Sequence, residues 1–308
     1  MVKTYLDCVP CVVRQCLDAV RSVTDDRQLH EQMLREGLRL AADLDLNRPP
    51  PYVGQIIHRR IRELTGVDDP YWAAKTRFNQ LAMSMLPELR LIVRGSREPL
   101  EAAGRMAIAA NVIDLGVKAD LGEEQAGRAL RDAWMADVWG DFAEFRRQAE
   151  SAAQILYLAD NAGEIVVDRL LIEQLGPERV TVAVRGRPVI NDATLDDARA
   201  AGLHELVRVI DNGSDAPGTI LDDCNSSFRE RFREADLVVA KGQGNFETLS
   251  DVDRDVFFLL KVKCPVVARH VDLPLGQHVL LKRDGILPRE PRRSDNPVGV
   301  AGGRRVEP

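Results

Sequence analysis

The chain has 308 residues, which is long enough for two domains. Of these residues 45% are hydrophobic and 29% are charged, as is usual in globular proteins. Its formal net charge of -6 provides no overall positive field for nucleic acid, so the expected partner is a small molecule. No stretch approaches the apolar run that spans a bilayer, and the start has no secretory h-region. We therefore expect a cytoplasmic protein without membrane contact, and the sequence predicts no particular oligomeric state.

Up to about residue 150 the hydrophobic pattern is helical. Asp25 and Asp26 can cap a helix, and Pro99 fits the first turn of a later one. Residues 89–95 are the one doubtful strand in this half. The pattern predicts an all-helical domain over residues 1–150.

From about residue 152, short apolar runs alternate with amphipathic stretches. Strand followed by helix, repeated several times, predicts a parallel sheet with helices on its faces. The expected fold class is α/β, in which the N-terminal all-helical domain precedes a doubly wound, mainly parallel Rossmann-like sheet. That sheet domain should cover residues 151–282, and the aperiodic residues 283–308 should form a flexible tail. The strand-like runs are residues 154–160, 179–186, 205–213, 235–242 and 264–270.

Polar side chains follow the first two predicted strands. Asp160 and Asn161 end the first, Gly163 permits a sharp turn into the next helix, and Asp192 follows the second strand, about one βαβ unit later. Such pairs also form turns and helix caps, but their repetition at strand ends favours a site, because ligands bind beyond the carboxyl ends of parallel strands. Two carboxylates and an amide predict one divalent cation, Mg²⁺ or Mn²⁺ before Co²⁺ or Ni²⁺.

The fourth strand-like run ends in the sequence KGQGN. Gly242 and Gly244 allow the backbone to approach a ligand, Asn245 lies in the same loop, and the Lys241 ammonium can neutralise a phosphate oxygen. A dinucleotide fingerprint is excluded, since Glu247 occupies the place of its last glycine. With a divalent cation beside it, this loop predicts phosphoryl chemistry.

Four segments in order, LADNAGEIVVD, VRGRPVINDAT, VVAKGQGNFETL and LLKVKCPVVA, resemble the damage-control phosphatase family. The motifs CVPC and ANVIDLG extend this resemblance to the helical half. The resemblance implies that Asp160, Asn161 and Asp192 bind the metal and that residues 241–247 form the substrate-phosphate loop. It further implies metal-dependent hydrolysis of phosphate monoesters, in particular sugar phosphates or damaged phosphometabolites.

Two further positions are carried over from the family. Lys263 falls near a lysine that other branches carry in an Arg-Thr-x-Lys motif, although residues 260–263 contain neither Arg nor Thr. Asn111 and Asp114, three residues apart, project from one face of an apolar helix. Helix-end polarity near Gly116 explains that pair structurally, whereas a similar pair beside the family's cleft implies a contact with the substrate or with the residues that surround the metal ligands.

Five cysteines, three of them within the first seventeen residues, predict reduced thiols and no disulfide framework. Cys8 and Cys11 form a single C-x-x-C without the second pair that a zinc ribbon requires. They are either buried helical thiols or a candidate second metal or redox pair. The resemblance is to the family branch that carries an N-terminal cysteine pair.

The predicted function is a phosphatase in which a metal-activated water attacks small phosphate monoesters. Asp160 is the catalytic metal ligand, and Glu164 orients the ligands or relays a proton. Attack by Asp160 itself is the alternative, although Ala162 stands where nucleophilic-aspartate phosphatases carry a second aspartate. The rival functions are an S-adenosylmethionine-dependent carboxyl methyltransferase, which wants a glycine-rich first turn, and a non-catalytic, metal-stabilised ligand-binding protein.

Overall fold

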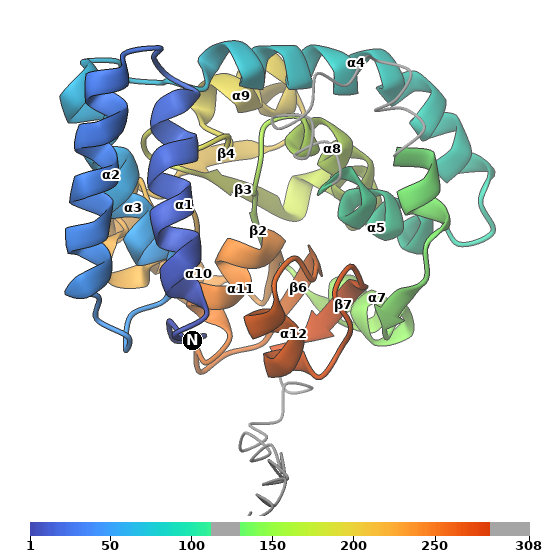
Figure 1. The fold of residues 1–308 in the computed structure, drawn as a ribbon. Coiled ribbons are helices and arrows are strands. Elements are labelled where there is room, and N and C mark those ends of the chain that lie inside the picture. The colour runs from blue at the N-terminus through green and yellow to red at the C-terminus, as the bar shows by residue number, and fades with distance from the viewer. Residues whose placement is uncertain (112–129, 284–308) are drawn as a thin grey trace, which may run out of the picture.

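In the computed structural model, residues 1–111 and 130–283 are described, and a mixed but mainly parallel sheet forms their centre (Figure 1). Within these residues the strand order is β1-β7-β6-β5-β2-β3-β4, and every neighbouring pair is parallel except β6 with β7. This arrangement confirms the predicted α/β class. The strands are β1 Val138–Gly140, β2 Ile155–Leu158, β3 Val180–Val184, β4 Arg208–Asp211, β5 Leu237–Lys241, β6 Val256–Lys261 and β7 His278–Lys282.

The strand order reverses between β2 and β5, the two central neighbours. From β2 the chain moves outward through β3 to β4, then returns to β5 on the other side and continues to β6. Crossovers that leave in opposite directions open a crevice at the carboxyl ends of the two central strands. Asp160 and Lys241 lie at those two ends.

Helices cover both faces of the sheet. Successive side chains of β2 point to opposite sides, so each face contributes to a buried cluster. Ile155 and Tyr157 join one buried cluster, and Leu156 and Leu158 join the other. The first face is covered by α4 Trp72–Gly95, α5 Pro99–Ala109, α7 Phe142–Ser151, α8 Glu164–Leu175 and α9 Leu195–Ala200. The second is covered by α10 Ser226–Glu234, α11 Gly242–Leu249 and α12 Pro265–Val271.

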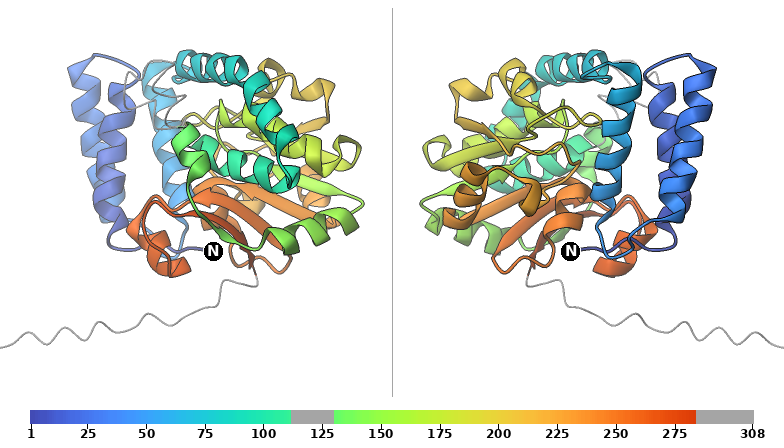
Figure 2. Two further views of the ribbon diagram at one scale, coloured as in Figure 1. Left: turned by 90° about the vertical axis from the view of Figure 1, so that its right-hand side faces the viewer. Right: turned by 90° about the vertical axis from the view of Figure 1, so that its left-hand side faces the viewer.

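The first three helices form a separate layer beside the sheet, visible in blue in both side views (Figure 2). They are α1 Cys8–Arg21, α2 Arg27–Ala42 and α3 Pro50–Thr65, and they enclose their own apolar cluster around Cys16, Met33 and Ile57. Asp215, in the loop after β4, accepts hydrogen bonds from Gln55, Arg59 and Arg62 of α3. This buried carboxylate therefore fastens the helical layer to the sheet.

The domain division at residue 150 stays a prediction. α4 and α5, which precede that residue, share one buried cluster with α8 and with the sheet, and β1 adds an edge strand. Their apolar faces thus contribute to the core of the second half. The helical content predicted for the first half is present, but only α1 to α3 have a core of their own.

One strand assignment was wrong, and the doubtful strand is part of a helix. Residues 264–270, predicted as a strand, form α12, whose Cys264 cap and Pro265 at the first turn begin a helix. The doubtful strand at 89–95 is the last part of α4. The predicted tail begins at Arg283, and residues 284–308 lie outside the described residues. No helix in the described ranges is long and apolar enough to cross a membrane.

Candidate metal and phosphate site

The loops after β2 and β3 are joined by backbone hydrogen bonds at the carboxyl edge of the sheet. Asn161 and Asp192 form an isolated antiparallel bridge. Ala193 N donates to the Asp160 carbonyl at 2.8 Å, and Ala162 N donates to the Asn191 carbonyl at 2.8 Å. Asp192 is therefore a neighbour of Asp160 and Asn161, although about thirty residues separate them in the sequence.

Arg185, at the end of β3, lies between the two carboxylates. Its Nε is 2.7 Å from Oδ2 of Asp192, and one terminal nitrogen is 3.8 Å from Oδ1 of Asp160. The side chain is only 2% exposed, so this guanidinium is part of the buried site. From the sequence alone, no role was assigned to Arg185.

The amide of Asn161 is oriented by two carboxylates. Its Nδ2 donates to Oδ2 of Asp160 at 3.0 Å and to Oε1 of Glu164 at 2.7 Å. Both amide hydrogens are therefore used, and the carbonyl oxygen Oδ1 receives no hydrogen bond from the described residues. An amide held this way presents an oxygen ligand to a cation.

Glu164, the first residue of α8, is fully buried and accepts three hydrogen bonds. Oε1 accepts from the amides of Asn111 at 2.6 Å and Asn161 at 2.7 Å, and Oε2 accepts from Lys241 at 3.2 Å. Lys241 also lies 2.7 Å from Asp168, one helical turn further along α8. These contacts make Glu164 a positioning residue for Asn161.

Lys241 is 1% exposed, and its ammonium is directed at two buried carboxylates. Burial opposes its charge, but Asp168 and Glu164 outweigh burial and raise the pKa of Lys241. Burial raises the pKa of Asp168 to about 6, against the effect of Lys241. Within this arrangement Lys241 compensates buried charge, and its predicted contact with a phosphate stays a prediction.

Lys263 brings a more accessible cation to the same site. It lies in the loop after β6, is exposed, and is close enough to Asp160 to lower the pKa of that carboxyl. The stronger influences act in the opposite direction, since burial and the charges of Glu164 and Asp192 raise the pKa of Asp160 well above its ordinary value. The exposed position makes Lys263 better placed than Lys241 to meet a phosphate.

The glycines of the KGQGN loop are required by close packing. Gly242 has φ +78°, and a Cβ there would lie 1.9 Å from Oδ2 of Asp160. A Cβ at Gly244 would lie 2.1 Å from the carbonyl oxygen of Pro217. Asn245 is fully buried, donates to the Lys241 carbonyl at 2.8 Å and accepts from Arg185 at 3.2 Å. Asn245 thus links Arg185 to the backbone of Lys241.

Asn79 of α4 holds the turn that presents Asp160. Its Oδ1 accepts from the Gly163 backbone N at 2.7 Å, and its Nδ2 donates to Asp197 at 2.9 Å. Asp197 in turn pairs with the buried Lys75 at 2.8 Å. Sequence reasoning missed Asn79, because nothing in a helical pattern shows that a polar position faces a distant turn.

The remaining predicted residues are distributed differently. Asn111 reaches the site through Glu164, whereas Asp114 lies outside the described residues. All five cysteines are unpaired; Cys8 is half-buried near Cys264, and Cys11 is exposed. Burial raises the pKa of Cys8 above its ordinary value. The metal or redox role of the cysteine pair stays a prediction.

The donor set at the carboxyl edge fits a hard divalent cation. Asp160 and Asp192 provide two carboxylates beside the uncommitted oxygen of Asn161, and oxygen donors of this kind suit Mg²⁺ and Mn²⁺. In residues 1–111 and 130–283, no three side chains of Asp, Glu, His or Cys gather in a metal-binding arrangement. The amide is therefore an essential member of the set.

Comparison with known proteins relates the chain to one family. Residues 4–279 match the model of the damage-control phosphatase ARMT1-like domain. The chain is 36% identical to a damage-control phosphatase of Archaeoglobus fulgidus over 88% of its length and 96% of the relative. It is 32% identical to the uncharacterized protein MJ0202 of Methanocaldococcus jannaschii, covering 92% of this chain and 96% of that one.

A solved structure shares the fold. The crystal structure of a DUF89 family protein, PH1575 of Pyrococcus horikoshii, superposes with a TM-score of 0.83 at 33% identity, covering 92% of this chain and 100% of the other. The same relative carries the name damage-control phosphatase PH1575. These names support phosphatase activity.

Proposed function

The chain belongs to the damage-control phosphatase ARMT1-like family, and from that premise we propose that it is a divalent-metal-dependent hydrolase of small phosphate monoesters. Sugar phosphates and damaged phosphometabolites are the proposed substrates. The observation that carries the proposal is the meeting of Asp160, Asn161 and Asp192 at the switch point of the sheet. Two carboxylates and an oriented amide oxygen there match the needs of phosphoryl chemistry.

Asp160, Asn161 and Asp192 would hold the cation, which would supply a Lewis acid for the phosphoryl oxygens and lower the pKa of a bound water. Glu164 fixes the amide of Asn161 through their 2.7 Å hydrogen bond. Lys241 and Arg185 balance the buried carboxylates, and the exposed Lys263 binds the phosphate group. Positioning and charge stabilisation are the main contributions a protein makes to phosphoryl transfer.

Glu164 is better suited to orientation than to proton transfer. Oε1 accepts from Asn111 and Asn161, Oε2 accepts from Lys241, and the side chain is fully buried away from solvent. We expect Glu164→Gln to lower kcat through loss of the ligand geometry. The methyltransferase alternative is not favoured, since the matched relatives with assigned names are phosphatases.

The test is phosphate release by chelator-treated protein from p-nitrophenyl phosphate and a panel of sugar phosphates. Mg²⁺, Mn²⁺, Co²⁺ and Ni²⁺ are added singly. We expect activity only with added metal, and its loss in Asp160→Asn and Asp192→Asn. The control is Asp196→Asn, because the side chain of Asp196 is 85% exposed and lies just beyond the site loop. Tight binding of S-adenosylmethionine without phosphate release would support the methyltransferase instead.

A further inference from the structure

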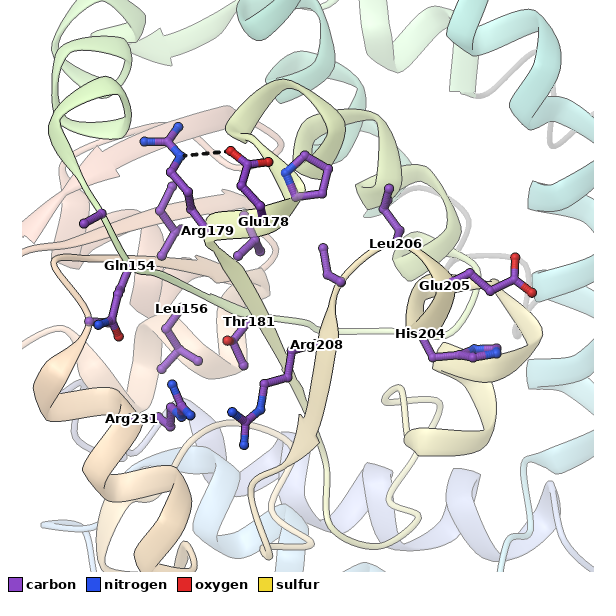
Figure 3. Close-up of a pocket in the computed structure, with 16 residues that line it drawn as sticks. Gln154, Leu156, Glu178, Arg179, Thr181, His204, Glu205, Leu206, Arg208 and Arg231 are labelled. Atoms are coloured by element: carbon purple, nitrogen blue, oxygen red, sulfur yellow. Dashed lines mark ion pairs between the residues drawn. The ribbon is translucent and has the colours of Figure 1, made fainter.

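A pocket of about 630 Å³ lies at the amino edge of the sheet, opposite to the proposed catalytic site (Figure 3). We call it the amino-edge pocket, and its walls include the beginnings of β2, β3 and β4. Since the three strands are parallel, their carboxyl ends, which carry Asp160 and Arg185, lie at the other edge. No part of the proposed phosphatase site lines this pocket.

One row of the sheet forms the floor of the amino-edge pocket. Leu156 of β2 pairs with Thr181 of β3, and Thr181 pairs with Arg208 of β4. Residues in register on adjacent parallel strands point to the same face. On that face α10 contributes Arg231, and Figure 3 shows the side chains of Arg208 and Arg231 directed into the same part of the pocket.

The guanidinium groups of these two arginines have no ionic partner among the residues that the structure describes. Within the described residues, neither Arg208 nor Arg231 makes a side-chain hydrogen bond or ion pair. Arg179, another lining residue, differs: its guanidinium donates to the carbonyls of Ala149 and Ala152. The two arginines therefore present free guanidinium groups in a chain whose net charge is -6.

The acidic residues of the pocket lie away from this pair. Glu178 is 4.0 Å from Arg179, and Figure 3 places Glu205 beside His204 at the far end. The lining also includes two neutral donors, the Thr181 hydroxyl and the Gln154 amide. Two guanidinium groups with neutral hydrogen-bond donors are a set that recognises phosphate oxygens.

We propose that the amino-edge pocket binds a small phosphorylated molecule, with its phosphate held by Arg208 and Arg231. The volume falls within the range of about 300 to 1,000 Å³ that small-ligand sites occupy. Pro177 and Leu206, which are half-buried lining residues, supply an apolar surface for the rest of the ligand. This site is separate from the proposed catalytic centre and does not depend on phosphatase activity.

The test is calorimetric titration of chelator-treated full-length protein with inorganic pyrophosphate at fixed ionic strength. We expect Arg208→Gln/Arg231→Gln to bind about tenfold more weakly than the wild type, because two charge-assisted contacts are lost. Thr181→Val, which changes no charge, should weaken binding by about threefold. The matched control is Arg229→Gln/Arg233→Gln, which removes the same charge from exposed positions of α10 outside the pocket.

Phosphate bound at the carboxyl edge contributes equally to all of these variants, so their differences report the amino-edge pocket. Asp160→Asn, in which the proposed catalytic site is impaired, should retain the arginine-dependent binding. Unchanged affinity in Arg208→Gln/Arg231→Gln would overturn the proposal. Equal weakening in the control pair would also overturn it, since binding would then follow overall charge. Thermal melting confirms that each variant is folded.

Discussion

At the level of single residues, the carboxyl edge of the sheet is packed so closely that Gly242 has no space for a side chain. Gly242→Ala places a Cβ where Oδ2 of Asp160 now lies and also strains a backbone at φ +78°. We expect kcat/KM to fall by about 100-fold, because displacing a catalytic group by about 1 Å has that effect. Steady-state kinetics measure this loss.

Gly276→Ala is the matched control for this prediction. Gly276 has φ +85°, and a Cβ there would meet nothing within 4 Å. This substitution should cost about 1 to 3 kcal/mol in backbone strain alone and leave kcat/KM unchanged. Equal loss of activity in the two variants would show that backbone strain, and not the contact with Asp160, is responsible.

The buried pair between Arg185 and Asp192 gives a second prediction. Arg185→Met leaves the carboxylates of Asp160 and Asp192 without their shared cation, so we expect the free energy of unfolding to fall by about 3 to 5 kcal/mol. Urea denaturation measures the change. Adding Asp192→Leu should recover part of the loss, since an apolar pair replaces a broken ion pair. A double variant with a lower free energy of unfolding than either single variant would contradict this account.

The residues of the proposed site differ in how readily they can be identified from sequence. Asp160, Asn161 and Asp192 could be selected because polar groups at successive strand ends meet at one edge of a parallel sheet. Asp168 could have been found as well, since it lies four positions after Glu164 on the same face of α8. The burial of Lys241 against Glu164 and Asp168 could not be predicted, because sequence does not show that an ammonium turns inward.

At the level of elements, α4 helps to position the turn between β2 and α8. Asn79→Ala removes the acceptor of the Gly163 N–H group and one partner of Asp197. We expect about 1 to 3 kcal/mol of destabilisation from the unsatisfied groups. We also expect kcat to fall more than KM changes, because Lys263, the proposed phosphate-binding residue, is untouched.

Ser84→Ala tests whether any change in α4 has this effect. Ser84 is an exposed residue of the same helix and donates only to the Leu81 carbonyl. Its loss should leave kcat unaltered. If Asn79→Ala destabilised the protein without lowering kcat, the link between α4 and the site would be disproved.

Among the elements, the alternation of apolar runs with helical patterns correctly predicted the four strands β2 to β5 along the chain. The strand β6 was missed, although VFFLLK is an apolar run, because short buried runs do not reveal whether they are strand or helix. Residues 264–270 were misread for the same reason, and the proline at their second position was the decisive helix-start signal. The edge strand β1 has three residues, too few for a pattern.

At the level of the whole molecule, the buried His58 makes the free energy of unfolding depend on pH. Burial lowers its pKa to about 3, Arg62 adds to the effect, and Asp215 opposes it. Between pH 6.5, the ordinary histidine value, and about 3, the unfolded chain therefore binds a proton that the folded protein does not. Stability should fall as the pH decreases through this range, by about 2 kcal/mol at about pH 5.

Urea denaturation at a series of pH values checks this prediction in the wild type and in His58→Phe. Phenylalanine keeps a ring against Tyr71, whose centroid is 5.7 Å from that of His58, and it has no proton to gain. The difference in stability between the two proteins should therefore shift by about 2 kcal/mol between about pH 7 and pH 5. A constant difference would show that another group is responsible.

The central claim is that Asp160, Asn161 and Asp192 form one cation site for the whole molecule. Titration of chelator-treated protein with Mn²⁺, followed by electron paramagnetic resonance, counts the bound ions directly. We predict one strongly bound Mn²⁺ per wild-type chain, its loss in Asp160→Asn/Asp192→Asn, and its retention in Asp196→Asn. No strongly bound ion in the wild type, or an undiminished one in the double variant, would contradict the account.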